Sequence, residues 1–443
     1  MQKRSRYVVP LFLLIAVTTG ALRAQDFTGT WQGTLGTGKR ALRTILEVGQ
    51  EDSGPPRVAV LSIDQGGFDD AIAAEKVTLN GSVLKATFDR FGATYEGTLS
   101  ADGSSITGTL SQRGTSPLNF RRPTKQTAWL DPSPHTVRVI SVKKNVKLEV
   151  LDWGGSGRAV VLLAGLGNSA HVFDEFAPKL ATKYHVYGIT RRGFGFSSVP
   201  KSGYLADSLA DDVLTVLDSL GLKRPVLAGH SIAGEELSSI GSRYPERVAG
   251  LVYLDAGYQY AYYDSTQAHP LLSIAVAARQ LARLSDLSAP MSPESIRDVI
   301  QELLTTSLPE LEKDLSRWAP ELAAEPNQSV VPQPPPPNPV GQAIVEGEEK
   351  YTQIHDPVLA LYSGKASVPP GIVGDATAVA KADSAYVLAN TPQIDAFIRG
   401  VPSARVVVLH NADHYVFKSD EADVLREMRA FIDGLPASTQ TAP

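Results

Sequence analysis

The residues of this chain best suited to chemistry lie at positions 228–234, which read Ala-Gly-His-Ser-Ile-Ala-Gly. Ser231 stands between two glycines in a close match to the Gly-x-Ser-x-Gly pattern, with an apolar run before it and a helix-like run after it. Glycines permit a sharp strand-to-helix turn because a Cβ there would clash. Such a turn exposes the serine hydroxyl and aims the Ile232 N–H, at a helix N-terminus, toward developing negative charge. The run therefore predicts a nucleophilic serine with a backbone donor beside it.

Strand-like and helix-like runs alternate around Ser231, over residues 135–257 and again over 357–435. This alternation predicts a parallel sheet that is covered by helices on both faces. Runs 137–142 and 146–151 are expected to form an antiparallel hairpin at its start. The other expected strands are 159–163, 185–189, 225–228, 248–254, 357–362 and 404–409, and the expected helices are 173–184, 205–220, 235–243, 375–399 and 421–432.

The alternation stops at residues 258–356. Three amphipathic stretches appear there, and the proline-rich run 331–337 follows them as an expected extended connector. We interpret this region as a helical lid, an element that admits substrate and excludes water. The amphipathic stretches are 271–284, 293–305 and 308–324.

The order of these elements, with Ser231 after the fifth strand and an insertion after the sixth, resembles the α/β-hydrolase fold over residues 135–435. The resemblance implies a serine hydrolase that works by acyl transfer, with small-molecule carboxylic esters as substrates. Amides, lactones and carbon–carbon bonds are alternative substrates on the same fold. A dehalogenase or epoxide hydrolase is disfavoured, because those relatives use a carboxylate nucleophile. A non-catalytic exported binding protein is the alternative from another class.

The same resemblance suggests the base and the oxyanion donors. A serine hydroxyl needs a base that takes its proton, and the family's histidine occupies the loop after the last strand, where His414 stands. His410, at the end of that strand, is the alternative. Two backbone donors are expected to hold the oxyanion. These are the N–H groups of Ile232 and of Leu166, which lies in the loop 164–168 after the third strand.

The acid that orients the histidine departs from the family's commonest pattern. That acid usually follows the seventh strand, but residues 363–367 contain no carboxylate. Asp255 directly follows the sixth strand, the place that certain haloalkane dehalogenases use, and we favour it as the acid. Asp375 is the alternative, and Asp383 is a further carboxylate that could reach the histidine.

Residues 26–122 have the pattern of a separate all-β domain, a small barrel or sandwich. Short β-branched runs alternate with turn residues, and Asn80-Gly81 between two such runs predicts a hairpin. Residues 26–31 resemble the opening strand of a lipocalin-like barrel. The proline-containing segment 123–134 is the expected linker. A Gly-Thr-Leu triplet recurs at 33–35, 97–99 and 108–110.

The composition limits the remaining classes. With 443 residues, two to three domains are expected. A net charge of −5 does not favour a nucleic-acid partner, and the lack of cysteine excludes disulfides and thiolate metal sites. No cluster of metal ligands stands out, so neither a metal nor a cofactor is predicted.

The N-terminus predicts export. Basic residues, an apolar run and small residues follow one another over residues 1–24, as in a secretory signal peptide. We therefore expect a periplasmic or secreted protein with no stable membrane insertion after cleavage. Residues 436–443 are an expected disordered tail.

Overall fold

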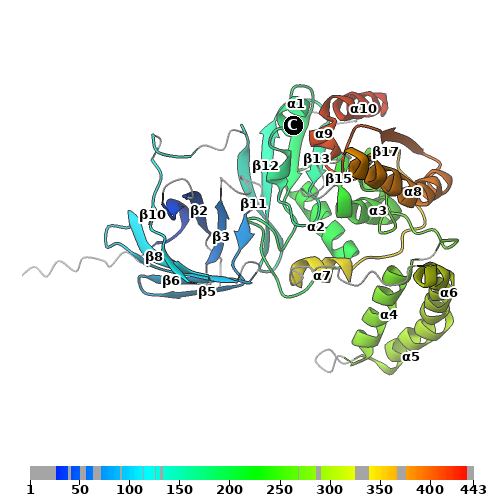
Figure 1. Cartoon of the computed structure of the whole chain (residues 1–443), viewed down its shortest axis with the longest axis horizontal. Helices are drawn as coiled ribbons and strands as arrows, with labels where there is room; N and C mark the ends of the chain where they lie inside the picture. The colour runs from blue at the N-terminus through cyan, green and yellow to red at the C-terminus, as the bar shows by residue number, and fades with distance from the viewer. Residues whose placement is uncertain are drawn as a thin grey trace, which may run out of the picture.

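The computed structural model describes residues 26–37, 41–49, 56–62, 71–89, 92–112, 114–124, 126–129, 133–267, 269–285, 291–324, 339–366 and 376–436. The expected signal peptide, the proline-rich run 331–337, Asp375 and residues 437–443 lie outside these ranges. Figure 1 shows a β domain on one side of the molecule and a larger α/β unit on the other.

The N-terminal domain is one curled antiparallel sheet, as the strand-and-turn pattern predicted, and not a sandwich of two sheets. Its order is β4-β3-β2-β1-β10-β8-β7-β6-β5, with β9 on β8. The sheet curls because β4 continues almost directly into β5: the Ala74 N–H donates to Val58 of β3 and the Glu75 N–H to Thr87 of β6. The strands are β1 (Gly29–Leu35), β2 (Leu42–Gly49), β3 (Arg57–Ser62), β4 (Ile72–Ala73), β5 (Lys76–Asn80), β6 (Val83–Phe88), β7 (Ala93–Leu99), β8 (Ser105–Ser111), β9 (Thr115–Pro117) and β10 (Phe120–Arg121).

Two sequence signals of this domain have a structural reason. The hairpin predicted at Asn80-Gly81 forms one residue later, because Asn80 pairs with Val83 and leaves Gly81 and Ser82 as its loop. The recurring Gly-Thr-Leu triplet places Gly97 opposite Gly108. A Cβ on either glycine would lie within 2.5 Å of the buried Tyr95 hydroxyl. The second and third copies of the triplet therefore make room for the Tyr95 ring, whereas Gly33 of the first copy packs against Asn119 and Phe120.

The α/β unit contains the eight-stranded sheet that the alternation predicted. Its order is β11-β12-β14-β13-β15-β16-β17-β18. β11 and β12 form the expected antiparallel hairpin, and the strands from β14 to β18 run parallel. The strands are β11 (Thr136–Lys143), β12 (Val146–Gly154), β13 (Ala159–Leu163), β14 (His185–Ile189), β15 (Val226–His230), β16 (Gly250–Leu254), β17 (Val358–Ser363) and β18 (Ala404–Leu409).

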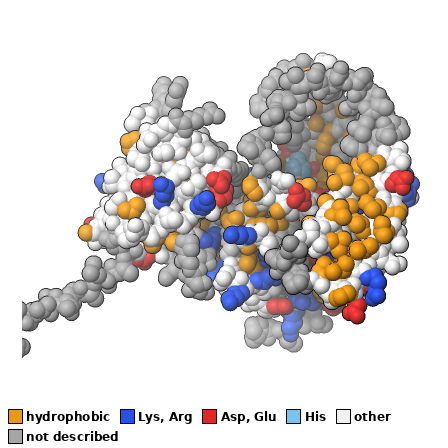
Figure 2. Space-filling model, turned by 90° about the horizontal axis from the view of Figure 1, so that it is seen from below, with side chains coloured by type: hydrophobic (Ala, Val, Ile, Leu, Met, Phe, Trp, Pro, Cys, Tyr) orange, Lys and Arg blue, Asp and Glu red, His pale blue; other side chains and the backbone are white. Residues whose placement is uncertain are grey.

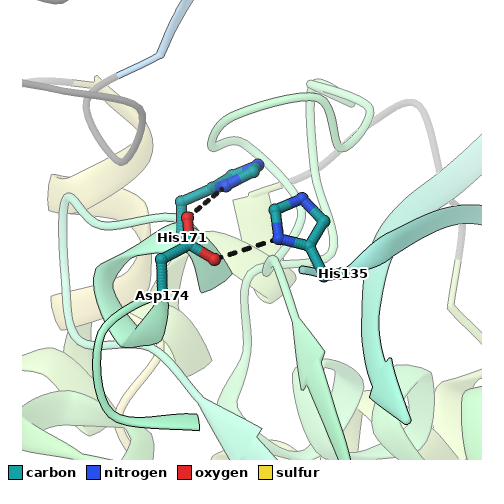
Figure 3. Close-up of side chains that lie close together, drawn as sticks. All are labelled: His135, His171 and Asp174. Atoms are coloured by element: carbon teal, nitrogen blue, oxygen red, sulfur yellow. Dashed lines mark hydrogen bonds and ion pairs between the residues drawn. The ribbon is translucent and has the colours of Figure 1, made fainter. Parts of the chain in front are cut away.

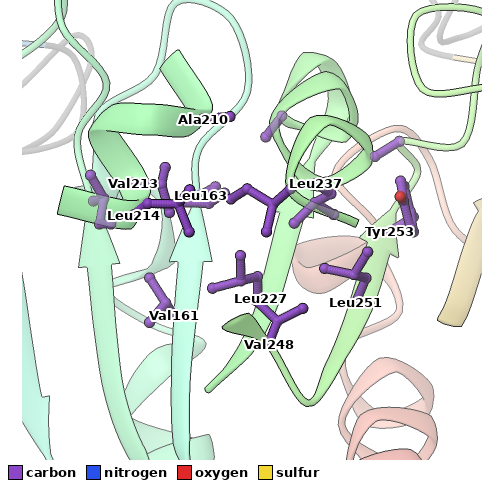
Figure 4. Packing of buried hydrophobic residues seen from close by; sticks show 14 of the residues in the cluster. Val161, Leu163, Ala210, Val213, Leu214, Leu227, Leu237, Val248, Leu251 and Tyr253 are labelled. Atoms are coloured by element: carbon purple, nitrogen blue, oxygen red, sulfur yellow. The ribbon is translucent and has the colours of Figure 1, made fainter. Parts of the chain in front are cut away.

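Helices cover both faces of this sheet over two buried apolar clusters. Figure 4 shows the cluster beneath α2 and α3, where Val213 and Leu237 meet strand residues such as Leu163 and Leu227. The second cluster packs η4, α1, α9 and α10 on the other face. The helices are η4 (Ala170–Phe173), α1 (Ala177–Ala181), α2 (Ala206–Ser219), η5 (Ser231–Ala233), α3 (Gly234–Arg243), η6 (Pro245–Arg247), α8 (Ala376–Gly400), α9 (Val416–Ser419) and α10 (Glu421–Gly434).

One expected helix is much shorter than its pattern. Residues 173–184 were expected as one helix, but the structure has the short turn η4 and then α1. Pro178 stands in the first turn of α1. A proline has no N–H to donate and clashes with the preceding turn, so the helix starts there and does not continue from Phe173.

The insertion after β16 is helical, as expected, and projects from the sheet (Figure 1). It contains α4 (Pro270–Ser285), α5 (Pro293–Glu302), the π-helix η7 (Leu303–Ser307), α6 (Leu308–Ala324) and α7 (Pro339–Val345). Two expected amphipathic helices are one continuous helix here, because η7 joins α5 to α6. α7 was not expected.

The insertion exposes apolar side chains on its outer face. Leu271, Ile274 and Leu281 of α4 are exposed, and the first two line a groove of about 450 Å³ between α4 and the C-terminal end of α7 with the residues that follow it. Figure 2 shows apolar side chains gathered on the side where the insertion lies. In the part of the chain that the structure describes, no helix has the length and apolar character that a membrane span needs.

Candidate active site

Ser231 lies on a strained turn between β15 and α3. Its φ is 54°, in the left-handed region that residues other than glycine rarely adopt. The residue two positions after the serine is Ala233, and the second glycine, Gly234, comes one position later. A Cβ on Gly234 would lie 2.1 Å from the Ala256 carbonyl oxygen. The second glycine therefore lets α3 pack closely against the end of β16.

Two residues distant in sequence lie beside this serine. The Nε2 atom of His414, in the loop after β18, is 3.0 Å from the Ser231 Oγ. The Nδ1 atom of His414 is 2.7 Å from Asp255 Oδ2, just beyond β16. His410 is exposed at the end of β18. Asp383 accepts a hydrogen bond from the Ala366 N–H, and Asp375 is outside the described residues.

Asp255 is completely buried, and hydrogen-bond donors surround its carboxylate. The Ser363 N–H donates to Oδ1 over 2.8 Å, and the Ser363 hydroxyl donates to Oδ2 over 2.8 Å. The Tyr258 hydroxyl donates to Oδ1 over 2.7 Å, and Tyr386 lies 3.3 Å from Oδ2. A buried carboxylate is tolerated only with such compensation. The carboxylate is therefore held in one orientation toward His414.

Sequence reasoning missed these supporting groups. Ser363 ends β17, the seventh strand of the α/β unit, where the family's acid usually stands. A serine there cannot replace the acid, but it donates to the acid of the neighbouring strand. The absence of a carboxylate from residues 363–367 was the one sequence feature that pointed to a different role for the end of this strand. Tyr258 and Tyr386 come from the insertion and from α8, and no local spacing relates them to Asp255.

His230, next to the nucleophile, holds the loop of the candidate base. Its Nε2 is 2.9 Å from the His414 carbonyl oxygen, and its ring packs on those of His414 and Tyr415. Burial, with the charge of His414 second, lowers the pKa of His230 to about 3. The ring is therefore neutral near pH 7, and its Nε2–H donates to the carbonyl group. His230 is a positioning residue for His414.

The loop after β13 passes directly over the serine. A Cβ on Gly165 would lie 2.7 Å from His230 Nδ1 and 3.2 Å from the Ser231 Cβ. Arg191 donates to the Ala164 carbonyl at the start of this loop. Leu166 is 39% exposed, so the loop is open to solvent beside the turn. This close backbone approach suits an oxyanion donor, and only a residue without a Cβ fits at position 165.

Tyr260 and Glu235 are two further titratable residues near the candidate site. Burial, with the charge of Asp255 second, raises the pKa of Tyr260 well above its ordinary value. Glu235 is fully buried, and neither of its carboxylate oxygens has a hydrogen-bond partner among the described residues. Burial, and then the neighbouring Glu236, raises the pKa of Glu235 well above its ordinary value. Its surroundings therefore disfavour the ionised form of Glu235.

The sequence is similar to those of known enzymes. The profile of a family described as alpha/beta hydrolase fold matches residues 158–420. A 2-(acetamidomethylene)succinate hydrolase from Mesorhizobium japonicum is 25% identical over 290 residues, which are 63% of this chain and 89% of that protein. A fluoroacetate dehalogenase from a Burkholderia species is 34% identical over 107 residues, 23% of this chain and 35% of that protein. The crystal structure of an esterase from Rhodococcus sp. ECU1013 aligns with a TM-score of 0.43 and 20% identity, over 68% of this chain and 99% of that one.

Proposed function

This chain belongs to the α/β-hydrolase family and is a hydrolase, and from that premise we propose that it cleaves small carboxylic esters by acyl transfer through Ser231, His414 and Asp255. The observation that supports the proposal most strongly is the continuous contact from Ser231 Oγ to His414 Nε2 and from His414 Nδ1 to Asp255. A base in hydrogen-bond reach of the nucleophile, oriented by a third group, is the arrangement that activates a serine.

The first half of the reaction forms an acyl-enzyme. His414 Nε2 takes the Ser231 proton while Oγ attacks the ester carbonyl carbon, and Asp255 stabilises the resulting imidazolium. The Leu166 and Ile232 N–H groups donate to the oxyanion of the tetrahedral intermediate. When the intermediate collapses, the carbon–oxygen bond to the alcohol breaks, and His414 returns its proton to the departing alkoxide.

The second half releases the acid. His414 takes a proton from water as the water oxygen attacks the acyl carbon, and the same backbone donors hold the second oxyanion. The bond to Ser231 Oγ breaks, and His414 gives the proton back to the serine. The enzyme returns to its starting protonation state, and the net reaction consumes one water per ester.

The direct test is the Ser231→Ala variant with short nitrophenyl esters. We expect hydrolysis by the wild type, a loss of at least ~10³-fold in kcat for the variant, and fluorophosphonate labelling of the wild type alone. Ser242→Ala, a serine further along α3 that bonds to the Gln353 carbonyl, is the matched control and should keep both properties. A wild type that neither turns over any short ester nor becomes labelled would favour the non-catalytic binding protein.

Amides are the second substrate class to test. The Mesorhizobium japonicum relative has a name that contains an acetamido group, and the same three residues can transfer an acyl group from nitrogen. Matched nitrophenyl ester and nitroanilide pairs of one acyl group separate the two classes. A higher kcat/KM for the anilide would overturn the proposal of an ester hydrolase and keep the role of Ser231.

We also propose that the mature protein is exported after cleavage near Ala24. The arrangement of basic, apolar and small residues over positions 1–24 supports this. N-terminal sequencing of the protein recovered from the periplasm or medium is the test. A chain that keeps Met1 and remains in the cytoplasm would contradict export.

A further inference from the structure

Three metal-ligand side chains lie close together in a part of the α/β unit that the proposed reaction does not use. His135 precedes β11, His171 is in η4, and Asp174 caps the end of η4. One candidate ligand atom from each lies within 4.8 Å of the other two. Figure 3 shows both imidazole rings with their Nδ1 atoms turned toward the Asp174 carboxylate, which lies between them.

The distances within this cluster are close to those of a metal site. His171 Nδ1 is 2.8 Å from Asp174 Oδ2, and His135 Nδ1 is 3.1 Å from Asp174 Oδ1. Ligand atoms about 2.0–2.1 Å from a tetrahedral Zn²⁺ are separated from one another by roughly 3.3 Å. The two histidine–aspartate separations therefore lie close to the spacing of ligand atoms around such an ion, and the two imidazole ligand atoms are within 4.8 Å of each other.

The cluster is enclosed and has one apolar wall. The side chains of His135, His171 and Asp174 are only 6–12% exposed. The two imidazole rings are 4.9 Å apart, and the His135 ring meets Trp153 edge-on at 5.7 Å. Enclosure favours the binding of a cation to fixed ligands, because few water molecules compete for the same groups.

The second nitrogen of His171 lies near a buried carboxylate, at an ion-pair distance. His171 Nε2 is 3.6 Å from the Oε1 atom of Glu149, which is buried in β12. The Thr190 hydroxyl donates to the other oxygen of that carboxylate over 2.6 Å. A histidine that ligates through one nitrogen usually donates its other N–H to a carboxylate, which fixes its tautomer. In the metal-free protein His171 Nδ1 is hydrogen-bonded to Asp174, and a bound ion would bridge the same two atoms in place of that contact.

We propose that His135, His171 and Asp174 form a binding site for one divalent transition-metal ion of the zinc type. Two imidazole nitrogens and one carboxylate oxygen suit this class of ion and do not suit Ca²⁺ or Mg²⁺, which prefer oxygen ligands. Three protein ligands leave a coordination position for water.

The site is a structural clip and is distinct from the Ser231 site. It joins the segment before β11 to η4, which starts directly after the loop that passes over Ser231. The chain has no cysteine, so neither a disulfide nor a thiolate site can make such a cross-link. Bound metal therefore stabilises the native state and steadies the start of η4.

The test uses the full chain without a polyhistidine tag, treated with chelator and then titrated with Zn²⁺. We expect about one tightly held Zn²⁺ per chain and a rise in Tm on loading. H171A should lose at least ~10-fold in Zn²⁺ affinity and most of that rise. H185A is the matched control, because His185 also contacts a carboxylate, Asp152 at 2.9 Å, but there the third group is the cation Arg138.

Two further measurements test the metal site independently of the H171A variant and of the proposed ester hydrolysis. Co²⁺ bound to the wild type should give the visible absorption of a tetrahedral nitrogen–oxygen site, a readout that does not depend on the folding of H171A. S231A should bind Zn²⁺ as the wild type does, so failure of the proposed ester hydrolysis and failure of the metal site are distinguishable. Wild type that retains no Zn²⁺ after dialysis, or H171A that binds it equally well, would overturn the proposal in favour of a hydrogen-bonded His-Asp-His cluster alone.

Discussion

At the residue scale, the site depends on how a buried carboxylate is hydrogen-bonded and oriented. Asp255 receives donors from Ser363 and Tyr258 as well as from His414, so both of its oxygens are engaged. Its φ of 50° is a second left-handed conformation next to that of Ser231. The left-handed backbone at the ends of β15 and β16 directs the Ser231 and Asp255 side chains toward His414, which a regular strand-to-helix connection would not do.

Replacing Asp255 by Asn should lower kcat by ~10³–10⁴-fold while leaving KM within a few fold. An amide can present its N–H₂ to His414 and so favour the wrong tautomer of the ring, and it cannot stabilise the imidazolium. Ester hydrolysis and urea unfolding would be measured together. D383N and D375N are the matched controls and should stay near wild type. If D375N loses activity while D255N keeps it, the assignment of the acid is wrong.

At the element scale, loops at the carboxyl ends of the parallel strands build the site. Ser231, Asp255 and His414 follow β15, β16 and β18, and the loop containing Leu166 follows β13. Parallel strands bring their carboxyl ends to one edge of a sheet. The resemblance to the α/β-hydrolase family, applied to the expected strand order, indicated these positions, and the structure brings the first three within hydrogen-bond distance.

Other parts of the site had no signal of this kind. Tyr386 reaches Asp255 from α8, 131 residues away, and Tyr258 lies where the insertion begins. The metal-ligand cluster was also missed, because His135 and His171 stand alone in different segments. Only tertiary packing relates such pairs. The exact turn at Gly81 depended on local backbone geometry that periodicity does not encode, and the late start of α1 depended on Pro178, which the helical pattern over 173–184 did not take into account.

The loop after β13 should tolerate no side chain at Gly165. In G165A the new Cβ would lie 2.7 Å from His230 Nδ1, so the loop must move away from Ser231. We expect kcat to fall ~10–100-fold with a smaller change in Tm, because displaced oxyanion donors weaken the transition state more than the fold. G434A is the control, since a Cβ at Gly434 meets no atom within 4 Å. Equal kcat for G165A and wild type would contradict this role of the loop.

The turn into β17 should make stability depend on pH. Burial raises the pKa of Asp356 to about 7, and the carboxyl is 3% exposed. Its folded pKa lies above its unfolded one, so stability is fully present below about pH 4 and is lost as pH rises through 7. Between pH 5 and pH 8, ionisation of Asp356 should lower the free energy of unfolding by on the order of 2–3 kcal/mol.

The D356N variant tests this loss of stability. Its free energy of unfolding should fall less between pH 5 and pH 8 than that of the wild type, because the amide does not ionise. Urea titrations at both pH values measure the difference. D218N, which removes an exposed carboxylate that pairs with Arg247, should keep the wild-type slope. Parallel pH dependences for D356N and wild type would show that Asp356 is ionised in the folded protein.

At the scale of the whole molecule, the β domain and the α/β unit share an apolar contact. Ile45, Leu61 and Ala71 form a buried cluster in the β domain, and Trp129 and Phe196 pack against it. Phe196 belongs to the loop after β14, so this contact joins the curled sheet to the larger unit. Shared burial of this kind couples the unfolding of two domains.

Truncating Leu61 should therefore affect both domains. Leu61 is 5% exposed, and L61A should cost ~2–4 kcal/mol through lost burial and the cavity left behind. Calorimetry and the temperature at which ester hydrolysis is lost would be compared for the same samples. Because the contact is shared, we expect the calorimetric unfolding temperature and the temperature at which activity is lost to fall together. L79A, at a leucine that is 43% exposed in β5, is the control and should change little. If calorimetry shows that part of the L61A protein unfolds at a lower temperature while activity is lost at the wild-type temperature, the α/β unit holds its site without support from the β domain.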